Sequence, residues 1–219
     1  MVVLEEIEHI RTTLLKYTRK AFQKLPKFDK CQILDIGCGS GIPTLELASL
    51  SGGEVIGIDI DQSCLDKLKQ KILEQNLSNQ VKALCISVFG LDFADESFDV
   101  IWSEGIIRGI DFETALKNWR RLLKPNGYLV IHYQVSLVKD SLSRIPQFGY
   151  TLFDTVFLPK DVWWTDFYKP LEKKMSALHR KYANNLDALK LLEQLQSEMD
   201  IVKQNPCNFS CAFYILKKV

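Results

Sequence analysis

Three things are scarce in this 219-residue sequence: charge of one sign, paired cysteines and long apolar runs. Lysine and arginine total 28 against 27 aspartates and glutamates, so the net charge is +1. A near-neutral chain without a basic run lacks the charge that holds proteins on nucleic-acid phosphates. No apolar run approaches the ~20 residues that span a bilayer, and the first residues form no basic-then-apolar signal. We therefore expect a cytoplasmic protein with no membrane span and no nucleic-acid partner.

The cysteines also exclude several kinds of site. None of the six forms a Cys-x-x-Cys pair, and most fall within expected strands or helices. This usage argues against zinc and disulfides and favours buried, reduced thiols. We expect no metal site. The six residues are Cys31, Cys38, Cys64, Cys85, Cys207 and Cys211.

The stretch 33–48 is the most informative part of the chain. Residues 33–36 form an apolar run that contains Asp35 and reads as a buried strand. Gly37, Gly39 and Gly41 follow at alternate positions, and helical apolar spacing begins directly after them. Glycine lets a ligand approach the main chain, and a glycine turn between strand and helix is a docking point for nucleotide-like ligands. The Gly-x-Gly-x-Gly spacing differs from the dinucleotide fingerprint.

An acid ends the next expected strand, at residues 54–59. Asp59 lies 18 residues beyond Gly41, where a carboxylate can accept hydrogen bonds from two vicinal ribose hydroxyls. Asp61 is instead placed to cap the helix that follows. Ile60, and Ser87 and Val88 after the expected strand 81–86, are candidates to meet an adenine ring, although core packing explains Ile60 and Val88 nearly as well.

Three motifs carry a resemblance to a known family. DIGCGSG resembles motif I of the class I S-adenosylmethionine-dependent methyltransferases. LDFADESFDVIW and RRLLKPNGYLVI resemble later motifs of the same family, and SEG with Trp163-Trp164 resembles its ubiquinone/menaquinone-type branch. The resemblance implies S-adenosyl-L-methionine as cofactor. It assigns cofactor contacts to Asp35, Gly37, Cys38, Gly39, Gly41, Asp59, Ile60, Ser87, Val88, Ser103 and Glu104, with Tyr17 and Arg19 as secondary candidates.

The implied reaction is methyl transfer to a small-molecule acceptor by in-line displacement. Glu104, His132 and Tyr133 lie at the carboxyl edge of the expected sheet and are candidate proton handlers. Each has a plainer alternative: binding of the charged methionine end for Glu104, and a packing role alone for His132 and Tyr133. Arg108 stands where this branch usually has a tyrosine, so the acceptor is left open. The candidate substrate contacts are Arg108, Trp163, Trp164 and Tyr168.

The expected fold is α/β: a Rossmann-like, seven-stranded sheet, mostly parallel with an antiparallel last strand. Helices should cover both faces, with single helices over 3–24 and 111–123, a turn at 124–127, and one more helix and turn over 136–150. A helical insertion at 159–205 is expected between the last two strands, over the acceptor site. Residues 1–219 are expected to form one domain, with 1–26 as a helical lid.

Other functions remain open on the residues alone. The acceptor can be a protein or RNA, and the protein can be a non-catalytic, S-adenosylmethionine-binding regulator. A nicotinamide oxidoreductase is disfavoured by the glycine spacing and by the late LLKPNGYLV segment. A homodimer is kept open, as is the inserted segment serving only as a helical hairpin or a dimer contact.

Overall fold

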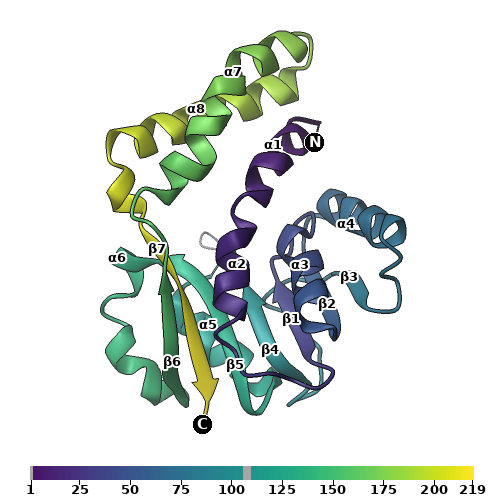
Figure 1. The fold of residues 1–219 in the computed structure, drawn as a ribbon, viewed down its shortest axis with the longest axis vertical. Helices are drawn as coiled ribbons and strands as arrows, with labels where there is room; N and C mark the ends of the chain where they lie inside the picture. Colours follow the sequence, from purple (N-terminus) through teal and green to yellow (C-terminus); the bar gives the residue numbers. More distant parts are fainter. Residues whose placement is uncertain (1, 106–109) are drawn as a thin grey trace. The chain divides into compact units, whose positions relative to one another are not determined.

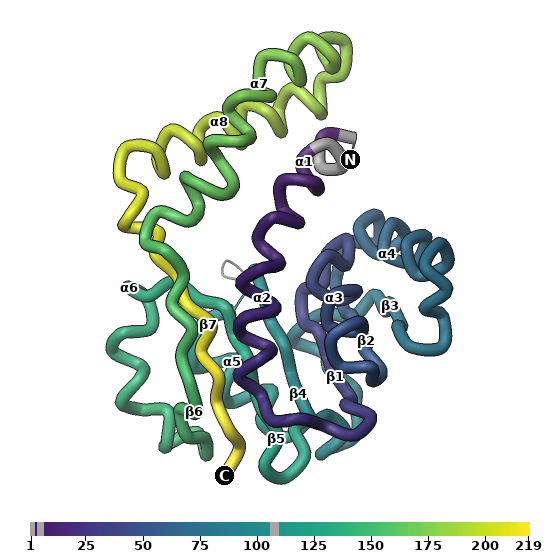
Figure 2. The backbone as a smooth tube through the Cα atoms, in the orientation of Figure 1, coloured from purple at the N-terminus to yellow at the C-terminus, as the bar shows by residue number. Residues whose placement is uncertain are grey.

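The computed structural model describes residues 2–105 and 110–219. The chain divides into two compact units. We call Tyr17–Phe157 with Ala212–Val219 the sheet unit, and Met1–Lys16 with Leu158–Cys211 the helical unit. Each unit is built from segments that are far apart in the sequence (Figure 2).

The sheet unit is organised around a seven-stranded sheet of order β3-β2-β1-β4-β5-β7-β6 (Figure 1). The pairs β1/β2, β2/β3, β1/β4 and β4/β5 are parallel, and β6 and β7 are antiparallel. The expected mixed sheet, and the insertion between its last two strands, are thereby confirmed. The strands are β1 Gln32–Ile36, β2 Glu54–Asp59, β3 Val81–Cys85, β4 Phe98–Ser103, β5 Leu123–Gln134, β6 Tyr150–Phe157 and β7 Cys211–Lys218.

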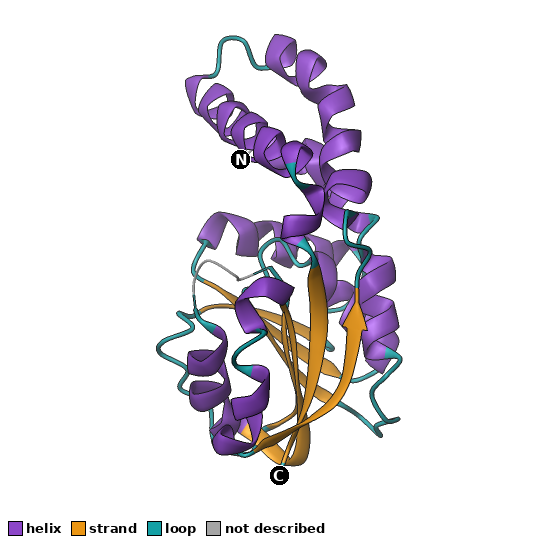
Figure 3. Ribbon diagram, turned by 90° about the vertical axis from the view of Figure 1, so that its left-hand side faces the viewer, coloured by secondary structure: helices purple, strands orange, loops and turns teal. Residues whose placement is uncertain are grey.

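Helices flank the sheet (Figure 3). Buried side chains pack them against it. On one face, Trp119 and Leu116 of α5 share a cluster with Leu34, Ile101 and Leu129 of the strands. On the other, Trp102 of β4 contacts the rings of Phe22 in α2 and Phe213 in β7. Burying each such side chain contributes about 1.5–3 kcal/mol. The helices are α2 Leu15–Phe22, α3 Ile42–Ser51, α4 Gln62–Glu74, α5 Phe112–Trp119 and α6 Val135–Val138, with 3-10 turns at Arg120–Leu122 and Leu142–Phe148.

The helical unit has an apolar core of its own. Ile7 and Ile10 of α1 are buried with Leu171 of α7 and Leu192 of α8. The inserted segment thus forms its core jointly with the first helix of the chain. The elements are α1 Val2–Thr12, a π-helical turn Trp163–Tyr168, α7 Lys169–Lys181, α8 Leu186–Gln204 and a 3-10 turn Pro206–Phe209.

The expectation of one helix over 3–24 is wrong, because the helix breaks between α1 and α2. The Thr12 and Thr13 hydroxyls donate to the carbonyls of His9 and Ile10, each over 2.7 Å. The backbone amide of Thr13 also donates a hydrogen bond to the Ile10 carbonyl, three residues earlier, and not to the carbonyl four residues earlier as in an α-helix. Threonine hydroxyls compete in this way for carbonyls that a continuous helix would use. The break lies just before the boundary between the two units.

The segments around β5 also depart from expectation. The helix expected over 111–123 ends at Trp119, and β5 already begins at Leu123. The expected turn at 124–127 is a bulge within β5: Leu123 pairs with Phe98, but Tyr128 pairs with Val100. Residues 136–150 hold two short helical turns instead of one helix.

The cysteines only partly follow the prediction. All six are free, but Cys85 and Cys207 are exposed and Cys64 is partly exposed. Cys85 ends β3, an edge strand whose outward positions face solvent, so its place in a strand did not bury it. Within residues 2–105 and 110–219, no helix is long and apolar enough to cross a membrane. Among the same residues, no three His, Cys, Asp or Glu side chains are grouped so that they could hold a metal ion.

Candidate active site

The glycine turn after β1 leaves open space beside its main chain. Gly37, Gly39 and Gly41 have φ angles of 76°, 52° and 83°, in the left-handed region that favours glycine. A Cβ on Gly39 would meet nothing within 4 Å, whereas one on Gly41 would come 2.2 Å from Leu68 of α4. The turn is therefore packed against α4 at Gly41 and open at Gly39.

Asp59, at the end of β2, holds this turn. Its Oδ2 accepts the Gly39 amide at 2.8 Å and its Oδ1 accepts the Asp61 amide at 2.9 Å. A carboxylate offers about four acceptor positions, so Asp59 keeps capacity for two further donors. Asp61 caps α4 by accepting the Ser63 and Cys64 amides, as its position in the sequence predicted.

Two acids lie where burial opposes their charge. Asp35 in β1 is 1% exposed and accepts the Thr44 hydroxyl at 2.6 Å. Burial raises the pKa of Asp35 from 3.8 to about 7, and the Thr44 hydrogen bond opposes that shift. The charge of Asp59 raises it further. A cationic ligand group near Asp35 would relieve this cost.

Glu104 follows the last residue of β4 and is held by two donors. The Thr18 hydroxyl of α2 donates to Oε2 at 3.0 Å, and Trp102 Nε1 donates to the same oxygen at 3.2 Å. Burial raises the pKa of Glu104 from 4.5 to about 7 against these hydrogen bonds, and the charge of Asp35 adds to the rise. Asp35 and Glu104 thus form one electrostatically linked acidic region at the ends of neighbouring strands.

The other candidate proton handlers are buried within β5. His132 is 4% exposed and packs on Phe213, with ring centroids 4.8 Å apart. Burial lowers the pKa of His132 to about 4, so its ring is neutral at pH 7. The Tyr133 hydroxyl donates to the Ile110 carbonyl at 3.3 Å, and its ring packs on Phe112. Ser103 is fully buried.

The adenine candidates lie at the ends of β2 and β3. The Ile86 amide donates to the Asp59 carbonyl at 3.1 Å, which joins these two strand ends. Ser87 begins a turn closed by the Gly90 amide, and Val88 packs against the core below. Ile60 is 73% exposed.

The remaining predicted residues are more scattered. Arg19 forms an ion pair with Glu46 of α3, 2.6 Å between Nε and Oε1, and Tyr17 lies two residues earlier on α2. Cys38, within the glycine turn, is buried with its side chain near Gly57. Arg108 lies outside the described residues.

Three predicted substrate contacts belong to the helical unit. Trp163 and Trp164 are partly buried against its core. The Tyr168 hydroxyl donates to Glu198 of α8 at 3.1 Å. These side chains contribute to the packing of that unit.

Four residues in this region were not predicted. Thr18 and Trp102 bond to Glu104, and Thr44 bonds to Asp35. Phe89 is 71% exposed in the turn after β3. Phe89 could have been noticed in the sequence, because it is a large apolar residue in a turn and belongs to no strand or helix pattern. Nothing in the sequence links Thr18 to Glu104, which is 86 residues away.

The strand order, the glycine turn after β1 and the acid that ends β2 belong to a Rossmann-like fold that this chain shares with solved methyltransferases. Solved structures agree. A methyltransferase from Geobacter sulfurreducens in complex with S-adenosyl-L-homocysteine superposes with a TM-score of 0.74 at 18% identity, over 93% of this chain and 91% of that one. The [4+2]-cyclase SpnF gives a TM-score of 0.77 at 18% identity, over 93% and 80%.

Sequence comparison points to the same family. The family model described as a methyltransferase domain matches residues 34–131. A demethylmenaquinone methyltransferase from Lactobacillus johnsonii is 35% identical over 114 residues, which are 51% of this chain and 47% of that protein. The chain spans about half the length of the curated relatives it matches.

Proposed function

We propose that this protein transfers a methyl group from S-adenosylmethionine to a small-molecule acceptor. The observation that carries the proposal is the pairing of Asp59 with the open turn at Gly39. The Asp59 carboxylate can accept two more hydrogen bonds, and it lies beside the Gly39 main chain, where no side chain blocks a ligand. These features fit a nucleoside that carries an amino acid through a sulfur link, such as S-adenosylmethionine.

The acidic region fits the other end of such a ligand. Asp35 and Glu104 both have a pKa raised to about 7 by burial. An ammonium group bound there would stabilise their ionised forms. Ile60, directly after β2, and Phe89, in the turn after β3, are exposed and offer apolar surface for a purine ring.

In this proposal the protein's task is alignment and proton handling. When bound, S-adenosylmethionine supplies a sulfonium methyl carbon that an acceptor lone pair attacks in line. Glu104 has a second, alternative role as the base for a hydroxyl acceptor. Its pKa of about 7 in the ligand-free protein suits that role only where Asp35, and not Glu104, holds the ammonium group. His132 and Tyr133 are buried among aromatic rings, which supports packing roles for them.

The choice of a small-molecule acceptor rests on the relatives and on charge. The Lactobacillus johnsonii relative acts on demethylmenaquinone, and a relative from Aspergillus nomiae, 28% identical over 128 residues, is an O-methyltransferase. A net charge of +1 gives no support to an RNA acceptor. We propose that the helical unit, with Trp163, Trp164 and Tyr168, contributes to acceptor selection.

Calorimetric titration with S-adenosylhomocysteine tests the proposal. The wild type should bind this ligand and should not bind NADH. Asp59→Ala should raise the Kd about tenfold or more, since hydrogen bonds to a charged group are lost. Asp61→Ala is the matched control: it removes a helix cap two residues away and should leave the Kd within about twofold. Equal effects of the two substitutions would contradict the ribose assignment.

Turnover separates an enzyme from a regulator. The wild type and Glu104→Gln should be screened against phenols, amines and small carboxylic acids, with S-adenosylhomocysteine release as the readout. Release with one class identifies the acceptor chemistry. Tight cofactor binding without release in any class would favour the non-catalytic alternative.

A further inference from the structure

The connection from β3 to β4 contains no helix. Residues 86–97 run between the two strands as turns and extended chain. Backbone carbonyls in such a segment need donors from elsewhere, because no helix or ladder supplies them. The donors for this connection come largely from one side chain.

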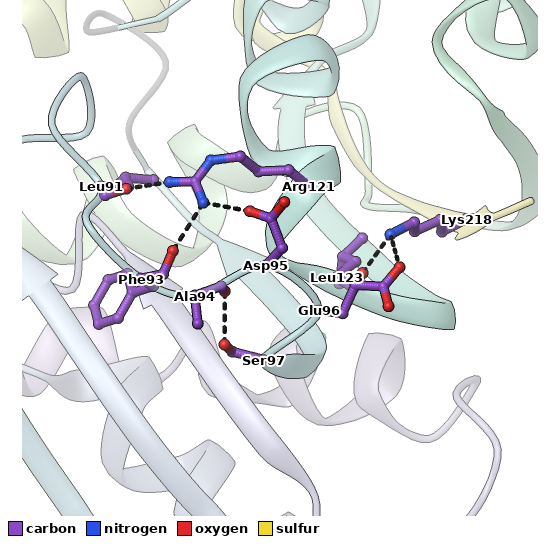
Figure 4. Close-up of polar contacts among 9 residues, drawn as sticks. All are labelled: Leu91, Phe93, Ala94, Asp95, Glu96, Ser97, Arg121, Leu123 and Lys218. Atoms are coloured by element: carbon purple, nitrogen blue, oxygen red, sulfur yellow. Dashed lines mark hydrogen bonds and ion pairs between the residues drawn. The ribbon is translucent and has the colours of Figure 1, made fainter.

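Arg121, in the 3-10 turn after α5, spans three acceptors of this connection (Figure 4). One guanidinium nitrogen donates to the Phe93 carbonyl at 2.8 Å and to Asp95 at 2.7 Å, and the other donates to the Leu91 carbonyl. The Arg121 carbonyl in turn accepts the Glu96 amide at 2.9 Å. The planar, five-donor guanidinium suits this multiple contact, which a lysine ammonium cannot reproduce.

The Asp95 contact alone does not explain the arrangement. Asp95 and Arg121 expose 70% and 44% of their side chains, and ion pairs so exposed contribute little. The far end of the connection has its own tie, because the buried Lys218 donates to the Leu123 carbonyl and pairs with Glu96. The distinctive contribution of Arg121 is therefore its hold on the Leu91 and Phe93 carbonyls.

These contacts enclose the turn at Ser87–Gly90. Before the turn, the Ile86 amide is bonded to the Asp59 carbonyl, and directly after it the Leu91 carbonyl is bonded to Arg121. The four residues between them include the exposed Phe89 and are closed by the Gly90 amide on the Ser87 carbonyl. The turn is thus tethered at both ends, once to the main chain of Asp59 and once to Arg121.

We propose that Arg121 is a positioning residue for cofactor affinity, which acts by fixing the Ser87–Gly90 turn beside the Asp59 end of β2. This inference rests on the proposed function, since it assigns the turn to the purine side of the same site. Arg121 itself touches no part of that ligand. Loosening its hold lets the turn sample other conformations, and the bound arrangement is then populated less often.

Arg120 provides a matched control. It is the adjacent arginine in the same 3-10 turn and also donates to backbone carbonyls, those of Gly149 at 3.3 Å and Val219 at 2.6 Å. Those acceptors belong to the β6–β7 side of the sheet. A general loss of stability should follow either substitution, whereas a loss of cofactor affinity should follow only one.

The test compares Arg121→Lys with Arg120→Lys in the full chain. Titration with S-adenosylhomocysteine should show a Kd raised about tenfold for Arg121→Lys and less than about twofold for Arg120→Lys. Melting temperatures establish that both variants are folded. Equal Kd values for the two variants would overturn the inference. Failure of the wild type to bind would instead overturn the proposed function.

Hydrogen exchange gives a second readout that a merely structural role would not produce. The Gly90 amide is protected by its bond to Ser87, so its exchange rate reports on the turn. In Arg121→Lys it should exchange faster, and saturating S-adenosylhomocysteine should restore slow exchange. Unchanged exchange at Gly90 in Arg121→Lys would contradict the tether.

Discussion

At the scale of single residues, Asp35 and Glu104 are carboxylic acids whose ionised forms are disfavoured in the folded protein. Both carry a pKa raised to about 7, chiefly by burial. Such groups lower stability at neutral pH, and a ligand cation can recover the difference. The same two residues should therefore destabilise the free protein and strengthen its cofactor complex.

Glu104→Gln should stabilise the free protein in a pH-dependent way. The folded pKa of about 7 exceeds the ordinary value of 4.5, so the stabilising contribution of the protonated form is full below about pH 4.5 and is lost as pH rises through 7. The variant should gain about 3 kcal/mol over wild type at pH 8 and less than about 1 kcal/mol at pH 5, where only the unfolded carboxyl group is substantially ionised. Thermal unfolding at both values measures this. An equal gain at pH 5 and pH 8 would show that ionisation is not the cause.

Gly39→Ala should separate ligand binding from folding. Gly39 and Gly52, the residue that follows α3, have φ angles of 52° and 60°, and a Cβ at either would meet nothing within 4 Å. Each alanine substitution should cost about 1–2 kcal/mol of backbone strain. Only Gly39→Ala should also weaken S-adenosylhomocysteine binding, by about tenfold or more, because the new methyl group occupies ligand space. Similar Kd values for both variants, measured by calorimetry, would contradict the location of the site.

At the scale of helices and strands, the ends of elements are set by identifiable side chains. Asp111 precedes α5 and accepts the Thr114 amide at 3.0 Å. Hydrogen bonding from the Thr114 side chain, and next from the Thr114 amide, lowers the pKa of Asp111. Asp111→Ala should reduce stability by about 1 kcal/mol, whereas Asp111→Asn should retain most of the cap. Thermal unfolding compares them. An asparagine variant as unstable as the alanine variant would show that charge, not hydrogen bonding, dominates at this position.

The sequence predicted helices and strands that have a strong apolar periodicity, but it did not predict the places where such elements are interrupted. β2 matches its expected range, because the buried run 54–59 is bounded by Gly53 and by the Asp61 cap. The break at Thr12–Thr13 has no periodic signature, since it depends on hydroxyls that compete for local carbonyls. The bulge in β5 was missed for a related reason: the sequence of residues 124–127 reads as a turn, and only pairing with β4 makes it part of a strand.

The geometry of the candidate site was predictable where one motif carries it. The glycine turn and Asp59 lie together, as their spacing in the chain predicts, while their roles stay a proposal. The hold of Thr18 on Glu104 and of Arg121 on Leu91 joins residues far apart in sequence, and the residues alone give no sign of either. The placement of Trp163 and Trp164 also depended on which core they joined.

At the scale of the whole molecule, each unit has its own core. Asp35, Gly39, Asp59 and Glu104 all belong to the sheet unit. The inserted segment shares its core with Ile7 and other residues of α1, so deleting the insertion alone would expose the apolar face of α1. A lid at 1–26, an insertion over the acceptor site, a homodimer and a cytoplasmic location stay predictions.

A variant that joins residues 15–157 to 212–219 through Asn-Gly should bind S-adenosylhomocysteine nearly as well as the full chain. Phe157 and Ala212 are paired across the β6–β7 ladder, so a two-residue hairpin can close the gap. We expect a Kd within about threefold of the full chain and no methyl transfer to its acceptor. Retained transfer would show that the helical unit has no part in acceptor selection.

The most direct test is a crystal structure of the protein with S-adenosylhomocysteine. We predict that the ligand lies against the Gly39 main chain, with both ribose hydroxyls on Asp59 and the ammonium group toward Asp35 and Glu104. Density for the ligand at any other place, with the space beside Gly39 filled by the protein's own side chains, would contradict the assignment of this site.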